Sequence, residues 1–273
     1  MNLLQSIILG IVQGLTEFLP ISSSAHLVLV PYLLGWEFPE NVAFVFDVLV
    51  QVATLFGVIT YFWKDLIAIL AAMWRGLLAK DLFGEPQARL GWLLLVATVP
   101  AGLFGLLVKD AIEAAFSNPA MTAVFLFVTA GLLVIAERVG KRNRELQQLT
   151  WWDAIWIGLF QAAAVFPGIS RSGATIAGGM TRNLDRPPAA RFSFLMSIPI
   201  MLAAGLLAST DLAQTPELTS LLPVFIPGFI VAGVVGYLSI RWLLHYLIRH
   251  PLYVFAIYCI GLGTLTLIVY WIR

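Results

Sequence analysis

Two interrupted apolar stretches decide the fold of this chain: FLPISSS at residues 18–24 and FPGISRS at residues 166–172. The first lies within the apolar segment 1–36 and the second within the segment 151–180. Proline removes a backbone donor, and its ring clashes with the preceding helical turn, so a helix ends or bends where it stands. Each segment is therefore predicted to be a hairpin of two short helices joined by a break.

Composition assigns the chain to the membrane. Of its 273 residues, 60% are hydrophobic and 11% are charged, and the mean hydropathy is +0.92. A soluble domain has roughly 45–50% apolar and about 25% charged residues. The net charge of +1 excludes a strongly basic nucleic-acid-binding protein. The single cysteine, Cys259, excludes a disulfide framework and a cysteine zinc site. No Lys or Arg precedes Lys64, so the N-terminal segment is expected to be mature structure and not a signal peptide.

Six further apolar segments are long enough to cross a bilayer, which takes roughly 17–25 helical residues. They are residues 42–63, 90–108, 119–136, 192–208, 218–240 and 251–272. Backbone groups freed by a broken helix have to be buried in protein or line a wet cavity. We therefore expect an all-α integral membrane protein with six full transmembrane helices and two broken, re-entrant hairpins.

The two hairpins belong to similar halves, residues 1–138 and 151–273, of a single membrane domain that covers residues 1–273. When residues 10–57 are laid over residues 158–205, identical residues coincide, and several of them fall in the breaks. The identities are Gly10, Gln13, Phe18, Ile21, Ser22, Ser24, Pro39, Phe44, Phe46 and Gly57. Three full spans separate the hairpins, and because three is odd the two copies face opposite ways. The pattern predicts an inverted repeat with a ligand site where the hairpins meet.

The positions of the basic residues predict the orientation. All of the 16 Lys and Arg residues except Lys109, Arg171 and Arg273 fall on one side of the six spans. Cytoplasmic loops carry an excess of Lys and Arg. Both termini are therefore expected on the outer side.

Ionisable side chains at membrane depth are costly and are functional candidates by default. Here they are Glu17, His26, Asp47 and Arg171. At the first break, Glu17 is a candidate acid/base and metal ligand, Ser22 and Ser23 are candidate nucleophiles or donors, and His26 is a candidate proton shuttle. The alternative is that these serines cap the broken helix and that His26 is a satisfied interior residue.

The second break places Ser170, Arg171, Ser172 and Thr175 at a new helix N-terminus. The N–H groups and dipole of such an end bind anions, and a guanidinium forks onto two oxygens, so this pattern predicts a phosphate cradle. The alternative is that Arg171 pairs with a carboxylate and holds the halves together, which needs Glu17 or Asp47 close by.

Asp47 and Gln51 lie one turn apart on the first full span. Together they would complete an oxygen-rich site for Mg²⁺ or Ca²⁺. They would equally serve as a hydrogen-bonded pair outside such a site.

The two break motifs together resemble the bacterial undecaprenyl pyrophosphate phosphatase family of bacitracin-resistance type. The first reads QGLTE at residues 13–17, followed by FLPISS at 18–23 and by His26, and the second reads PGISRSGAT at 167–175. The resemblance implies an enzyme of the bacterial plasma membrane that hydrolyses undecaprenyl pyrophosphate at the outer face. Undecaprenyl phosphate and inorganic phosphate would be released, which recycles the lipid carrier for cell-wall synthesis. Bacitracin would compete indirectly by binding the substrate, and a homodimer is left open.

Matching motif positions assign functional roles to Glu17, Ser22, Ser23, His26, Ser170, Arg171, Ser172 and Thr175. Gln13 stands where many members have Glu, and a neutral amide cannot act as a base, so it is expected only to contact the pyrophosphate.

The hypothesis that follows assigns pyrophosphate binding to Arg171 and its neighbouring hydroxyls, with Mg²⁺ or Ca²⁺ near Glu17. The nucleophile is either a serine hydroxyl or a water activated by Glu17 or His26, and the sequence leaves both open. The rival function is a secondary transporter or flippase of a lipid phosphate or small anion, since inverted repeats with broken helices are also typical of transporters.

Overall fold

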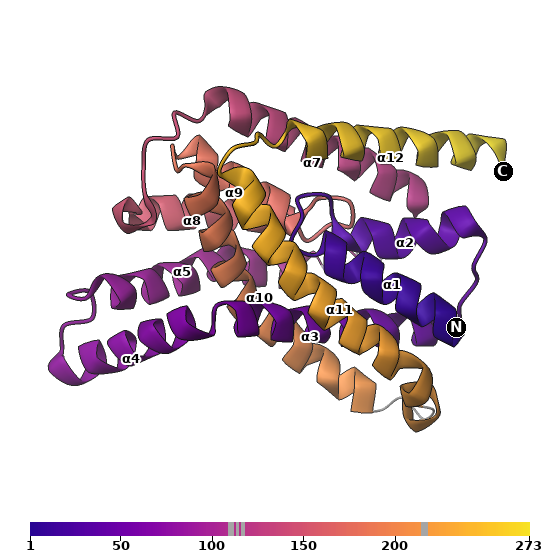
Figure 1. Ribbon diagram of the computed structural model, residues 1–273, viewed down its shortest axis with the longest axis horizontal. Helices are drawn as coiled ribbons and strands as arrows, with labels where there is room; N and C mark the ends of the chain where they lie inside the picture. The colour runs from indigo at the N-terminus through magenta and orange to yellow at the C-terminus, as the bar shows by residue number, and fades with distance from the viewer. Residues whose placement is uncertain (109–111, 113–114, 116–117, 214–217) are drawn as a thin grey trace.

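The computed structural model is all-helical over the part of the chain that it describes, which is residues 1–273 except 109–111, 113–114, 116–117 and 214–217 (Figure 1). Eleven α-helices and one short 3₁₀ helix, η1 (Leu146–Gln148), lie in these described residues. The α-helices are α1 (Leu3–Thr16), α2 (Ser23–Leu34), α3 (Glu40–Tyr61), α4 (Trp63–Ala79), α5 (Pro86–Leu107), α7 (Pro119–Val139), α8 (Trp151–Ala163), α9 (Arg171–Thr181), α10 (Arg186–Ala213), α11 (Leu218–Leu247) and α12 (Tyr253–Ile272).

Six of these helices, α3, α5, α7, α10, α11 and α12, are long and apolar enough to cross a membrane. Each coincides with one of the six predicted spans, so the chain is a multi-pass membrane protein. The predicted ends were less accurate. The span 42–63 stops at Tyr61, where a turn leads into α4, while α10 begins at Arg186 and α11 continues to Leu247. Hydropathy marks the apolar part of a helix, but backbone hydrogen bonding continues into the polar interface.

Both apolar hairpins are broken where the sequence predicted. Residues 17–22 separate α1 from α2, and residues 164–170 separate α8 from α9. The two breaks touch each other near the centre of the molecule (Figure 1), because Gly168 donates its N–H to Ser22 Oγ (3.2 Å) and Ser172 Oγ donates to the carbonyl of Leu19 (3.0 Å).

Each hairpin is held against a spanning helix by a close approach at a glycine. On α1, a Cβ added at Gly10 would come within 2.4 Å of the carbonyl oxygen of Gly228 on α11. On α8, a Cβ added at Gly158 would come within 2.5 Å of the carbonyl oxygen of Ala97 on α5. Small residues let membrane helices approach closely. Gly10 and Gly158 are aligned positions of the two halves, so the same residue serves the same packing purpose in both.

Two buried carboxylates, Glu137 and Asp153, link neighbouring loops by hydrogen bonds at the end of the molecule away from the termini. Glu137 accepts hydrogen bonds from Arg142 (2.8 Å), from Arg186 (2.7 and 2.6 Å) and from the N–H of Leu252 (2.8 Å). Both chain termini lie at the opposite end (Figure 1), where Arg273 donates to the carbonyl of Tyr32 (2.6 Å).

The second buried carboxylate, Asp153, lies in the first turn of α8 and forms a capping box with Thr150. Burial by itself would raise the pKa of the Asp153 carboxyl, but hydrogen bonds from Arg144, Arg182 and Thr150 outweigh burial and hold that pKa below its usual range. The start of the second hairpin is therefore anchored by an ionised carboxylate.

Candidate functional site

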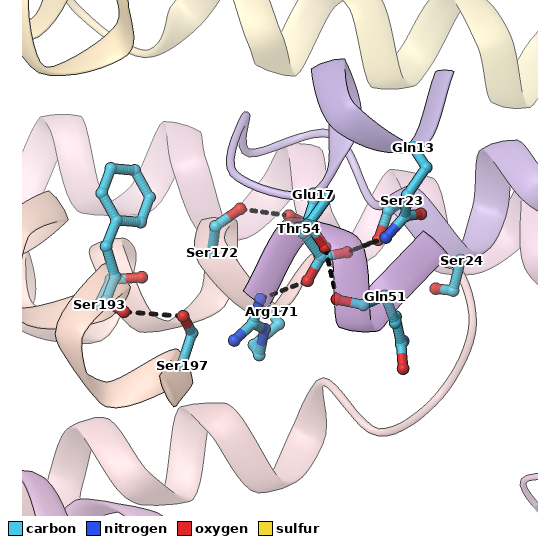
Figure 2. Close-up of polar contacts among 12 residues, drawn as sticks. Gln13, Glu17, Ser23, Ser24, Gln51, Thr54, Arg171, Ser172, Ser193 and Ser197 are labelled. Carbon is cyan, nitrogen blue, oxygen red and sulfur yellow. Dashed lines mark hydrogen bonds and ion pairs between the residues drawn. The ribbon is translucent and has the colours of Figure 1, made fainter. Parts of the chain in front are cut away.

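Glu17 forms the centre of a buried polar cluster between the two breaks. It caps the C-terminal end of α1, and only 6% of it is exposed. Its Oε2 accepts hydrogen bonds from Gln13 Nε2 (2.9 Å) and Ser23 Oγ (2.6 Å). Its Oε1 forms an ion pair with Nη2 of Arg171. Figure 2 shows the carboxylate between these partners. The tertiary fold thus brings Gln13, Glu17, Ser23 and Arg171 together, as the two motifs predicted.

Arg171 is the first residue of α9 and reaches across to the other half of the chain. The pairing with Glu17 is the one that the alternative interpretation of Arg171 required. It uses one arm of the guanidinium only, since the buried Nη1 has no hydrogen-bond partner. A buried donor left unpaired is costly. The second arm is therefore available to an anionic oxygen.

Two helix N-termini converge on this carboxylate. Ser23 begins α2 and Arg171 begins α9, and both side chains bind Glu17. Within the described residues, the backbone N–H groups of Ser23, Ser24, Arg171 and Ser172 donate to no other group. The first N–H groups of a helix have no partner in the helix and favour anions. The cluster therefore offers donors from two helices to one anionic ligand.

Ser22 and Ser23 are neighbours with separate roles. Ser22 has a positive φ of 69°, and its Oγ accepts hydrogen bonds from the N–H groups of Ala25 (3.4 Å) and Gly168 (3.2 Å). It caps α2 and joins the two breaks. Ser23 instead donates to Glu17, which is the arrangement of a hydroxyl beside a base. The geometry favours Ser23 over Ser22 as a nucleophile.

The hydroxyls of the second break build its turn. Ser170 caps α9 by accepting from the N–H of Gly173 (3.0 Å), and it lies 3.1 Å from Ser172 Oγ. Thr175 donates to the carbonyl of Arg171 (2.8 Å) and lies 2.6 Å from Ser193 Oγ on α10. The three predicted residues Ser170, Ser172 and Thr175 are all buried at the site. In this structure their hydroxyls shape the second break, and the free donors at this end of α9 are the backbone N–H groups of Arg171 and Ser172.

His26 has both ring nitrogens engaged by protein groups. Nδ1 lies 2.7 Å from the carbonyl oxygen of Ser22, and Nε2 lies 2.7 Å from the hydroxyl of Tyr258. A carbonyl only accepts, so Nδ1 carries the proton, and Nε2 then accepts from Tyr258 in a neutral ring. The ring thereby supports the carbonyl of the strained Ser22 turn. Its contacts match the satisfied interior histidine that the sequence left open, and within the described residues the ring forms no hydrogen bond to Gln13, Glu17, Ser23 or Arg171.

Three residues of the site were missed by the sequence reasoning: Thr129, Ser193 and Tyr258. Thr129 on α7 donates to the carbonyl of Gly168 (2.8 Å) and accepts from the N–H of Ser170 (2.9 Å), so it fixes the second break. A threonine within an apolar span usually bonds to its own helix, as Thr98 does to Leu94. Nothing in the local sequence distinguishes these two cases.

The metal ligands remain a prediction. Asp47 is partly buried on α3, and within the described residues it forms no hydrogen bond or ion pair with the Glu17 cluster. No group of three His, Cys, Asp or Glu side chains able to hold a metal ion occurs in the part of the chain that the structure describes. Gln51 of the same helix is exposed, and its side chain points away from Glu17 in Figure 2. Gln13 Oε1 is buried without a partner, which leaves one oxygen next to Glu17 available.

Comparison with known proteins extends the motif resemblance to the whole chain. The family model of the bacitracin resistance protein BacA matches residues 6–265. The chain is 45% identical to the undecaprenyl-diphosphatase of Chlorobaculum tepidum, with 98% of both proteins covered. It is 42% identical to that of Desulforudis audaxviator with 100% of both covered, and 41% identical to that of Methanosphaera stadtmanae with 98% of both covered.

Proposed function

Because the chain belongs to the bacitracin resistance protein BacA family, we propose that it is an undecaprenyl-diphosphatase whose reaction takes place at the Glu17 cluster. It hydrolyses undecaprenyl pyrophosphate to undecaprenyl phosphate and inorganic phosphate. One observation carries the assignment of the site. A buried carboxylate is held between a hydroxyl and a guanidinium at two converging helix N-termini, and one guanidinium nitrogen is left unpaired.

Substrate binding uses the donors that the protein leaves free. The terminal phosphate accepts from Nη1 of Arg171 and from the first N–H groups of α9, while the N-terminus of α2 faces the second phosphate. Phosphoryl transfer needs little covalent chemistry from the protein, so positioning and charge stabilisation dominate. Arg171 then stabilises the charge on the transferred phosphoryl group. Bacitracin, by binding the substrate, would deprive this site of its ligand.

The attacking oxygen is placed beside Glu17. Ser23 Oγ already donates its proton to this carboxylate, so either Ser23 or a water in its position can be activated there. The oxygen forms a bond to the terminal phosphorus, the bond to the bridging oxygen breaks, and lipid monophosphate leaves. Glu17 holds the proton that the attacking group gives up. If Ser23 attacks, water hydrolyses the phosphoserine in a second step.

A divalent cation, Mg²⁺ or Ca²⁺, fits the proposal if it binds together with the substrate. Glu17 and the unpaired Oε1 of Gln13 are the oxygen ligands that the cluster offers, with Asp47 as a further candidate on α3. Mg²⁺ is commonly held by one or two carboxylates together with substrate phosphates. When bound, the cation would neutralise pyrophosphate charge. It would therefore bind with the substrate, since the chain alone supplies few ligands.

The membrane arrangement is part of the same proposal. The two broken hairpins re-enter the membrane as inverted copies. The aligned packing of α1 on α11 and of α8 on α5 through Gly10 and Gly158 supports this symmetry. The end with the basic residues faces the cytoplasm, and both termini and the active site face outward. Labelling of single cysteines added at the two termini with an impermeant reagent tests this orientation.

The activity is tested with purified protein in detergent and a long-chain isoprenyl pyrophosphate. We expect phosphate release that EDTA abolishes and that Mg²⁺ or Ca²⁺ restores, while Arg171→Ala, purified in parallel, controls for contaminating phosphatases. Folded protein that releases no phosphate would overturn the proposal. A flux assay for the same lipid in liposomes would then test the rival function, transport.

A further inference from the structure

A large cavity lies away from the Glu17 cluster, between α4, α5, α10 and α11. Its volume is about 1270 Å³, and none of the cluster residues lines it. Small-molecule pockets usually enclose about 300–1,000 Å³, so this cavity has room for a long ligand. Its lining includes residues of the turn between α4 and α5 and of the end of α11. Both segments lie at the end of the molecule opposite the termini (Figure 1).

The cavity wall changes from apolar to cationic along α11. Leu93 and Leu195 form a buried apolar surface, and Leu238 on α11 continues it toward the outside. Arg241 and His245 follow on α11, one turn apart, and both line the cavity. Because Leu238 and Arg241 are three residues apart, they share a helix face. A ligand on this face meets hydrocarbon first and positive charge at the helix end.

Most of the other charges in the cavity already have partners. Arg191 pairs with Asp65 (2.7 Å), and Arg89 donates to the carbonyl of Leu149 (2.7 Å). Glu145 accepts from the N–H of Gln148 in the cap of η1. Among the described residues, Arg241 has no such partner for its side chain, and it is exposed. The cavity therefore offers one uncommitted cation next to an apolar wall.

We propose that this cavity binds an anionic phospholipid of the surrounding membrane. Its phosphate would lie against Arg241 and His245, and an acyl chain would lie along Leu238 and Leu195. Basic pockets between membrane helices are suited to acidic lipid headgroups, and a cation near a helix end pairs with a phosphate at headgroup depth. The exposed Trp242, which also lines the cavity, suits the same interfacial level.

The test is the unfolding temperature of delipidated protein in detergent. A ligand that binds only the folded state raises this temperature. Phosphatidylglycerol is expected to raise Tm by at least about 3 °C, while phosphatidylcholine and inorganic phosphate leave it unchanged. Arg241→Gln should lose more than half of the rise, and Arg241→Lys should keep most of it. Arg249→Gln is the control, because Arg249 lies in the turn that follows α11 and does not line the cavity.

The proposal is overturned by an equal rise in Tm with phosphatidylcholine or by an undiminished rise in Arg241→Gln. A rise with inorganic phosphate alone would indicate a simple anion site and would also contradict a lipid. If Arg241→Gln does not fold, loss of the rise in a charge-reversed Arg241→Glu variant, compared with Arg249→Glu, decides the question. Phosphate release is measured separately and is expected to be unchanged in Arg241→Lys, so failure here is distinct from failure of the proposed enzyme activity.

Discussion

The two broken hairpins share a scaffold but contribute different chemistry. Aligned serines, Ser22 and Ser170, cap the second helix of each hairpin. The next aligned position holds Ser23 in one hairpin and Arg171 in the other, and both side chains bind the same carboxylate. That carboxylate, Glu17, has only Val165 as its counterpart. The two breaks therefore bring two helix N-termini to one carboxylate, and their unequal side chains make different contacts with it.

This division makes the site depend on both halves at once. The Glu17–Arg171 pair is largely buried, and removing one partner of a buried pair leaves an uncompensated charge, which costs about 3–5 kcal/mol. A bound phosphate would be a replacement partner for the guanidinium. The comparison of the two hairpins can be tested by changing one side at a time.

The largest effect is expected for Arg171→Ala, which removes the contribution of the second hairpin. Loss of an arginine that stabilises a transferring phosphoryl group costs about 10³–10⁵ in turnover, so kcat for phosphate release should fall by at least about 10³. Arg171→Lys should recover only part of the lost turnover, because an ammonium group cannot bind two oxygens in the bidentate way that a guanidinium does. Turnover of Arg171→Ala within tenfold of the wild type would refute its role.

Glu17→Gln removes the contribution of the first hairpin while preserving its shape. A general base contributes about 10²–10⁴ in rate, so kcat should fall by at least about 10². The amide still accepts from Ser23, which limits the change in structure. Near-normal turnover in a folded Glu17→Gln variant would show that the assignment of base and metal ligand is wrong.

The neighbouring serines of the first hairpin provide a matched pair. Ser23→Ala should lower kcat by about 10² or more, if this hydroxyl attacks, with little change in Tm. Ser22→Ala removes a cap and an acceptor for Gly168, and loss of such a cap costs about 0.5–2 kcal/mol. It should therefore lower Tm and reduce kcat less. Steady-state kinetics and thermal unfolding of both variants separate these roles, and identical profiles would contradict the division.

The smallest effect is expected for Gln13→Glu, and it concerns the cation. The amide of Gln13 now donates to Glu17, whereas a carboxylate there would face another carboxylate. A divalent cation can bridge such a pair, so kcat should stay within about tenfold while half-saturation by Mg²⁺ or Ca²⁺ moves to lower concentration. Metal titrations after EDTA treatment measure this. A large loss of activity at saturating metal would indicate that the amide itself is required.

Local sequence was sufficient for the helical framework. The apolar runs predicted all six spans, and Pro20 and the Pro167-Gly168 pair predicted the two breaks. Both signals are local, because hydrophobic length and the missing proline N–H act on the helix in which they occur. The same local reasoning found Glu17 and Arg171, since charged residues within apolar segments are conspicuous. It was inaccurate only at helix ends, where the polar interface hides the continuing backbone pattern.

The tertiary structure decided which of these groups meet. The ion pair joins residues 154 positions apart, and His26 meets Tyr258 across 232 positions. The sequence predicted the same role for Ser22 and Ser23. Their contacts in the fold distinguish them, because Ser22 caps α2 whereas Ser23 donates to Glu17. Partner choice for a buried polar group depends on which donors lie within about 3 Å after folding. Helix formation is set by near neighbours, whereas these contacts are set by how two distant hairpins pack against each other.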